Sequence, residues 1–111
     1  EIIKSLAEKS NCVIVGRCAD YILEEYNPFK IFVYSDIDSK VKRCMERSQD
    51  YEKLTVKKAK RMIRKIDRER ARYYDFYAGQ TWGDKSNYDL CINTSNTEIK
   101  KIVPIIAKMF K

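Results

Sequence analysis

The fold rests on three short apolar runs: Cys12-Val13-Ile14-Val15, Ile31-Phe32-Val33-Tyr34 and Tyr88-Asp89-Leu90-Cys91-Ile92. The first two are continuous rather than alternating, which is typical of strands covered on both faces. Each run is followed by a turn and then by a helical pattern, over about 18–26, 38–48 and 97–110. Alternating strands and helices favour an α/β fold with a parallel sheet. Pro104 lies inside the last pattern, where we expect a kink or a split of the helix.

The longest helical pattern runs from about Thr55 to Tyr77, and Gly79 is expected to end it. It carries nine basic and three acidic residues, so six of the chain's seven net positive charges lie on it. Most of these should form a solvated face. Asp67 and Arg70 instead fall on the face that packs, where they must pair with each other or bind a ligand.

Composition narrows the classes of function. The chain has 111 residues and no histidine, which removes the usual general base and the commonest metal ligand. We predict no metal site formed by these residues. No apolar run approaches the roughly 20 residues that span a bilayer, so we expect no membrane partner. The four cysteines form no C-x-x-C pair, which favours reduced thiols and a cytoplasmic protein.

Ligands of open parallel sheets bind beyond the carboxyl ends of the strands. That rule points to Gly16-Arg17, Ser35-Asp36 and Asn93-Thr94-Ser95. Arg17 could bind a phosphate there or be a solvated turn residue. Asp36 or Asp38 is expected to cap the next helix, and for Asp36 we favour that role over a place in the site. That helix adds Lys40, Arg43 and Arg47, and two basic helices beside a strand end could close over a polyphosphate.

The order of these motifs resembles the C-terminal part of the cytidylate kinases, and in particular the cytidylate kinase-like family of P-loop nucleoside monophosphate kinases. The specific stretches are Lys65-Ile-Asp-Arg-Glu-Arg-Ala-Arg-Tyr-Tyr74, Trp82-Gly-Asp84 and Asn87-Tyr-Asp-Leu-Cys-Ile-Asn-Thr-Ser95. The resemblance implies a three-layer parallel sheet of the P-loop kinase type, of which residues 1–111 would form the C-terminal part. Three strands of that sheet would be present, and residues 38–77 would supply the lid and the acceptor-binding helices.

The resemblance also implies roles for individual residues. Arg17, Asp67 and Arg70 match residues that bind the nucleoside monophosphate. Arg43 matches a lid arginine that reaches the phosphates of ATP, with Lys40 and Arg47 beside it, and Asn93, Thr94 and Ser95 would lie near the adenine. Cytidylate kinases usually carry an arginine four residues before the helix aspartate. That position is Ile63 here, and Arg64 is one residue out of register. Arg64 is the fourth residue expected to bind the nucleoside monophosphate.

One family motif is absent. The sequence has no G-x-x-x-x-G-K-[ST], the loop that holds the phosphates of ATP and its Mg²⁺. We therefore expect an N-terminal P-loop half of the same protein as a partner, with these residues inactive alone. The resemblance therefore predicts that this chain is part of an ATP- and Mg²⁺-dependent kinase that acts on CMP or dCMP.

Two other readings come from different classes of function. One is a protein with a kinase-like fold that senses nucleotides or binds a partner without catalysis. The other is a basic nucleic-acid-binding domain. The sequence carries no recognised nucleic-acid-binding signature, and most of its excess charge falls in the expected lid region, so no nucleic-acid partner is predicted.

Overall fold

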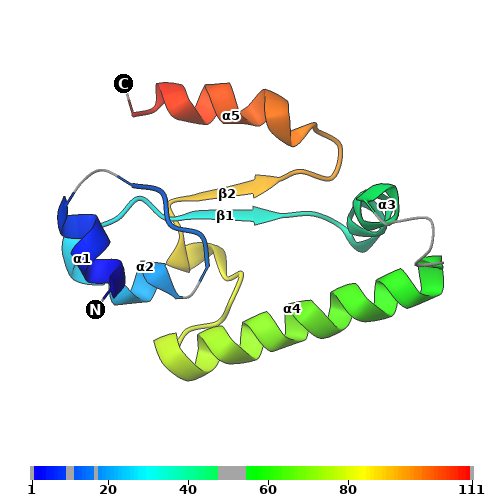
Figure 1. Ribbon diagram of the computed structural model, residues 1–111, viewed down its shortest axis with the longest axis horizontal. Helices are drawn as coiled ribbons and strands as arrows, with labels where there is room; N and C mark the ends of the chain where they lie inside the picture. The colour runs from blue at the N-terminus through cyan, green and yellow to red at the C-terminus, as the bar shows by residue number, and fades with distance from the viewer. Residues whose placement is uncertain (1, 10–11, 17, 48–54, 111) are drawn as a thin grey trace.

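Two short strands form the centre of the molecule. The computed structural model describes residues 2–9, 12–16, 18–47 and 55–110. Its elements are α1 (Ile2–Lys9), α2 (Ala19–Ile22), the 3-10 turn η1 (Glu24–Tyr26), β1 (Ile31–Tyr34), α3 (Ile37–Arg47), α4 (Val56–Ala78), the 3-10 turn η3 (Lys85–Asn87), β2 (Leu90–Asn93) and α5 (Ile99–Lys108). In Figure 1 the strand pair lies between α5 on one side and α4 on the other.

The strands β1 and β2 pair in parallel, from Ile31 opposite Leu90 to Tyr34 opposite Asn93. The pairing brings together two segments separated by 59 positions in the chain. Just before the strands, the backbone N–H of Lys30 donates to the Asp89 carboxylate at 2.7 Å. Both arrows in Figure 1 point toward the end of the molecule where α3 lies. The loops that follow the strands therefore start side by side at one edge of the sheet.

The predicted three-stranded sheet is wrong. Within the described residues the sheet has only two strands, and most of these residues are helical. The run at residues 12–15 belongs to no strand, and the side chains of Val13 and Val15 are 93% and 86% exposed. A strand exists only where a neighbouring backbone completes its hydrogen bonds, and no described segment does so here. The apolar composition of the run predicted a strand without identifying a partner for it.

The helices α3 and α4 begin and end at local signals. Asp36 accepts a hydrogen bond from the backbone N–H of Ser39 at 2.7 Å, so it caps α3 as predicted. Thr55 caps α4 by accepting from the N–H of Lys58 at 3.1 Å. Gly79 ends α4 in the left-handed conformation, at φ +66°, a region that most other residues avoid.

The remaining helices differ in detail from the sequence-based expectation. The helix predicted over 18–26 is split into α2 and η1, and Asn27 ends the second part in the left-handed conformation. In contrast, α5 continues through Pro104 as one helix, so the helix is not split there. None of the helices in the described ranges is both long and apolar enough to cross a membrane.

The best-buried cluster joins the end of α4 to the start of α2. Cys18, Tyr74 and Ala78 pack together with Trp82 against them. The Tyr74 hydroxyl lies 2.7 Å from an Asp20 carboxylate oxygen and 2.9 Å from the Gln80 side-chain oxygen. Burial, followed by the hydrogen bond to Asp20, raises the pKa of Tyr74 well above its usual value of about 10. The neutral phenol is thus the form that the folded protein holds.

Replacing Tyr74 with Phe tests this cluster. We expect Tyr74→Phe to lower the free energy of unfolding by about 1 kcal/mol, since one buried hydroxyl loses its partners. The unfolded chain ionises its tyrosines near pH 10 whereas folded Tyr74 stays neutral, so this group's contribution to stability falls as pH rises above about 10. The variant should therefore lose less stability than the wild type between pH 9 and pH 11, as measured by urea unfolding.

Tyr73→Phe is the matched control, because it removes the same hydroxyl from a neighbouring ring that is exposed to solvent. It should change stability by less than about 0.5 kcal/mol. Equal losses in the two variants would contradict the assigned role of Tyr74. Part of the loss of stability at alkaline pH should persist in Tyr74→Phe, because burial also raises the pKa of Tyr88.

Candidate functional site

The carboxyl edge of the sheet brings two of the three predicted ligand-binding loops together. The backbone N–H of Thr94 donates to the Tyr34 carbonyl at 2.8 Å, and the N–H of Asp36 donates to the Ser95 hydroxyl at 2.8 Å. The third loop contains Gly16, which turns at φ +72°. Its other predicted residue, Arg17, lies outside the residues that the structure describes.

The predicted adenine-side loop, Asn93 to Ser95, is held by its own hydrogen bonds and by α3. The Asn93 side-chain oxygen accepts from the Ser95 N–H at 3.0 Å and from the Ser95 hydroxyl at 2.6 Å. The Ser95 carbonyl accepts from the Ser39 hydroxyl at 3.0 Å. These contacts fix the first turn of α3 against the end of β2.

Asp36 strengthens the same junction. The N–H of Ser39 donates to its carboxylate, and this hydrogen bond is the main reason that the pKa of Asp36 lies below its usual value. The positive charge of Arg43 contributes in the same direction. The negative charge of Asp36 is therefore favoured at the start of α3, where the helix dipole also stabilises an anion.

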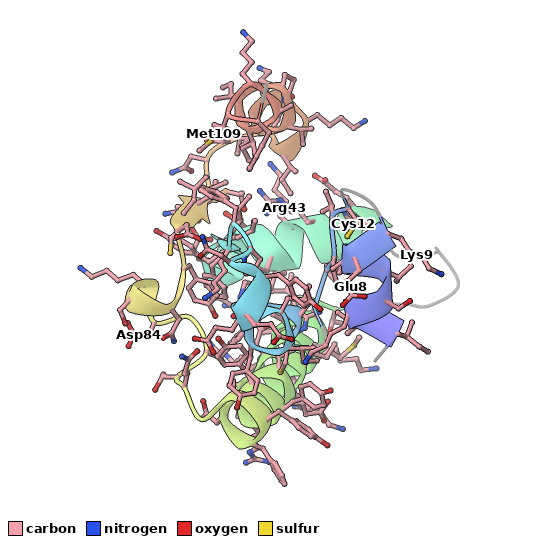
Figure 2. All side chains as sticks on the ribbon, turned by 90° about the vertical axis from the view of Figure 1, so that its left-hand side faces the viewer. Glu8, Lys9, Cys12, Arg43, Asp84 and Met109 are labelled. Atoms are coloured by element: carbon pink, nitrogen blue, oxygen red, sulfur yellow. The ribbon has the colours of Figure 1, made fainter. Side chains whose placement is uncertain are left out.

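Arg43 connects α3 to the loop after β2. Its NH1 group donates to the Thr94 hydroxyl at 3.0 Å, and its NH2 group donates to the Thr94 carbonyl. Figure 2 shows Arg43 on the side of α3 that faces α5. Its guanidinium is thus placed at the carboxyl edge of the sheet, where an anionic ligand would meet it.

A second charged group joins α3 to α4. The Lys40 ammonium lies 2.7 Å from one Asp67 carboxylate oxygen, and NH1 of Arg70 lies 3.2 Å from the other. The side chains of Lys40 and Asp67 are only 33% and 22% exposed, whereas that of Arg70 is 63% exposed. The sequence left a structural ion pair and a ligand site open for Asp67 and Arg70. The structure supplies the ion pair, extends it to Lys40, and leaves Arg70 accessible.

Two predicted site residues are not part of these groups. Arg47, the last residue of α3, is exposed and makes no hydrogen bond or ion pair within the described ranges. Arg64 lies in a shallow groove of about 330 Å³ along α4, and the described residues that line it are all basic: Lys57, Lys60, Arg61, Arg64 and Arg68. Among the described residues, Arg64 forms no hydrogen bond or ion pair with Asp67 or Arg70.

A known protein family matches most of this chain. Residues 1–96 match the cytidylate kinase-like family, a span that includes α3, α4, β2 and the Asn93–Ser95 loop. This chain belongs to the cytidylate kinase-like family. No curated protein matches it significantly.

The architecture is shared with a solved structure. The crystal structure of an uncharacterised protein from Eubacterium ventriosum ATCC 27560 is 38% identical to this cytidylate kinase-like chain, with a TM-score of 0.82. The match covers 97% of this chain and 60% of the other. The present chain thus spans about three fifths of the length of that relative.

Two contributors to the site in this family member escaped the sequence analysis. Ser39 and the Tyr34 carbonyl hold the Asn93–Ser95 loop in place, yet neither has a distinctive sequence signal. Both contacts depend on the pairing of β1 with β2 across more than 50 positions. Only the capping role of Asp36 had a local pattern that revealed it.

A double-mutant cycle on Lys40 and Asp67 tests the link between α3 and α4. We expect Lys40→Met and Asp67→Asn to show a coupling free energy of about 1 kcal/mol in urea unfolding, because the pair is short and partly buried. The control is the Lys60–Asp38 pair, which joins the same helices at 3.7 Å with the Asp38 side chain 85% exposed. Its coupling should be about 0.2 kcal/mol. A Lys40–Asp67 coupling no larger than that of the control would contradict the link.

Proposed function

We propose that the complete protein is an ATP-dependent nucleoside monophosphate kinase with CMP or dCMP as the first candidate acceptor. This chain would contribute the cations of the lid and part of the acceptor site. The observation that carries the proposal is the pairing of Asp67 with both Lys40 and Arg70. This pairing joins α3 to α4 through residues proposed for the lid and for the acceptor site, and it supports the proposal in a chain that belongs to the cytidylate kinase-like family.

On the donor side, Arg43 and Lys40 stand one turn apart on α3. A guanidinium and an ammonium are the groups that best neutralise phosphate oxygens. In the proposed site Arg43, Lys40 and Arg47 hold the phosphates of ATP, and the Asn93–Ser95 loop lies near the adenine. ATP supplies the phosphoryl group that is transferred.

On the acceptor side, Asp67 offers a carboxylate that can accept hydrogen bonds from ribose hydroxyls or a base amino group. Arg70 is the more exposed cation beside it, and with Arg17 it would hold the monophosphate. Ile63 stands where cytidylate kinases carry an arginine, so recognition of the base must rest on other residues. Arg64 was also expected to bind the nucleoside monophosphate. Because it lies in the basic groove along α4, we assign it a smaller part in acceptor binding.

The chemistry needs positioning and charge more than proton transfer. Phosphoryl transfer passes through a loose transition state in which negative charge spreads over the transferred oxygens. Cations fixed near those oxygens lower the barrier because they require little reorganisation. A chain without histidine can therefore contribute fully to such a site.

The rest of the site must come from a phosphate-binding loop outside these residues. The sequence contains no P-loop motif, and no described residues form a cluster of three or more acidic, cysteine or histidine side chains that could hold a cation. Mg²⁺ would therefore bind mainly to the nucleotide and to the N-terminal P-loop half, which is the partner this proposal requires.

Steady-state kinetics of the complete protein with CMP, dCMP, UMP and AMP test the proposal. Arg70→Ala should raise KM for the acceptor by about tenfold, since it removes one charged contact. Arg43→Ala should instead lower kcat, by about tenfold or more, since it removes a cation near the transferred phosphoryl group. Residues 1–111 alone should show no turnover.

Lys101→Ala is the control, because Lys101 is an exposed cation on α5. It should leave both constants within about twofold of the wild type. Unchanged constants in Arg70→Ala and Arg43→Ala would refute the site. If the wild type binds nucleotides without turnover, the proposed catalytic function would be wrong and nucleotide sensing would be favoured instead.

A further inference from the structure

Thr94 is the largest fully buried side chain among the described residues, at 2% exposure, and all of its polar groups are engaged. Its backbone N–H donates to the Tyr34 carbonyl at 2.8 Å, and its hydroxyl lies 3.1 Å from the same oxygen. The hydroxyl and the carbonyl of Thr94 both accept from Arg43. A small residue at the end of β2 therefore ties β1, β2 and α3 together.

The contact constrains Arg43 strongly. A free arginine side chain loses much of its rotamer freedom when it is fixed in one place. Here two nitrogens of one guanidinium are held by one residue, so its plane as well as its position is defined. Only two of its N–H donors are used in this way, and the others have no partner within the described residues.

The other lid cations are held differently. Lys40 is neutralised by Asp67, and Arg47 has no bonded partner in the described ranges. Arg43 alone among the three binds neutral oxygens, which position a guanidinium without cancelling its charge. The anchoring oxygens lie at the carboxyl edge of the sheet, beside the end of β1.

We propose that Thr94 is a positioning residue for Arg43. Its hydroxyl and carbonyl hold the guanidinium in advance at the sheet edge, with its charge intact and its remaining donors available to the phosphates of the bound nucleotide. This inference rests on the proposed function, because it assigns Thr94 a task in that same site. The loop from Asn93 to Ser95 was expected to lie near the adenine. Because the polar atoms of Thr94 already bind protein groups, we assign Thr94 no hydrogen bond to the adenine.

The experiment compares Thr94→Val with Thr94→Ser in the complete protein. Valine keeps the shape of threonine but cannot hydrogen-bond, whereas serine keeps the hydroxyl. We expect Thr94→Val to lower kcat by about tenfold with little change in KM for the acceptor, as a misplaced cation would. Thr94→Ser should recover most of that loss. Thr97→Val removes a similar hydroxyl from an exposed position three residues away, and serves as the control.

A second experiment distinguishes a positioning role of Thr94 from a purely structural one. If Thr94 acts through Arg43, then Thr94→Val should lower kcat by less than about twofold in an Arg43→Ala background. A similar tenfold loss in both backgrounds would overturn the proposal. So would a Thr94→Val variant with a lower melting temperature but an unchanged kcat well below that temperature.

Binding measurements keep this inference distinct from the proposed function. If the wild type binds ATP but shows no turnover, the kinase proposal fails. The positioning of Arg43 is then read from the Kd for ATP by isothermal titration calorimetry. Thr94→Val and Arg43→Ala should each weaken binding by about fivefold to tenfold, and the double variant by no more than Arg43→Ala alone. Undiminished ATP binding by Thr94→Val, or no ATP binding by the wild type, would overturn the positioning role.

Discussion

The parallel pairing of β1 with β2 is the constraint on which the rest of the site depends. It sets Tyr34 opposite Asn93, and so brings the loops after both strands to one edge. The Thr94 contacts to Tyr34, the Ser95 contact to Asp36 and the Arg43 contacts to Thr94 all require that register. A shift by one residue would turn each side chain to the opposite face and break the group apart.

The two helices that carry the candidate residues are fixed by different kinds of force. Hydrogen bonds to uncharged oxygens hold α3 to the loop after β2, through Ser39 and the charged guanidinium of Arg43. Charge holds it to α4 through the Lys40–Asp67 pair. A hydrogen bond to an uncharged oxygen is less affected by salt than an ion pair, whose attraction weakens as salt screens both charges. The attachment of α3 to the sheet should therefore depend less on salt than its attachment to α4.

How far the sequence could predict this structure depends on how local each signal is. The limits of α4 were predictable because Gly79 acts within one helical turn, and the same holds for the Asp36 cap of α3. The run at residues 12–15 misled because a strand needs a partner that composition cannot reveal. The Arg43–Thr94 contact joins residues 51 positions apart, so no local pattern could have revealed it. The family resemblance identified the candidate residues without indicating which of them would meet.

The basic groove along α4 has a consequence for the helix itself. Its side chains repeat at intervals of three and four residues, so like charges face each other across successive turns. Each such repulsion costs a few tenths of a kcal/mol in water, and it acts on the helix that also carries Asp67 and Arg70. At physiological ionic strength the screening length is about 8 Å, longer than one helical turn. The repulsion along α4 is therefore reduced but not abolished under cellular conditions, and this helix is most stable where counterions collect along it.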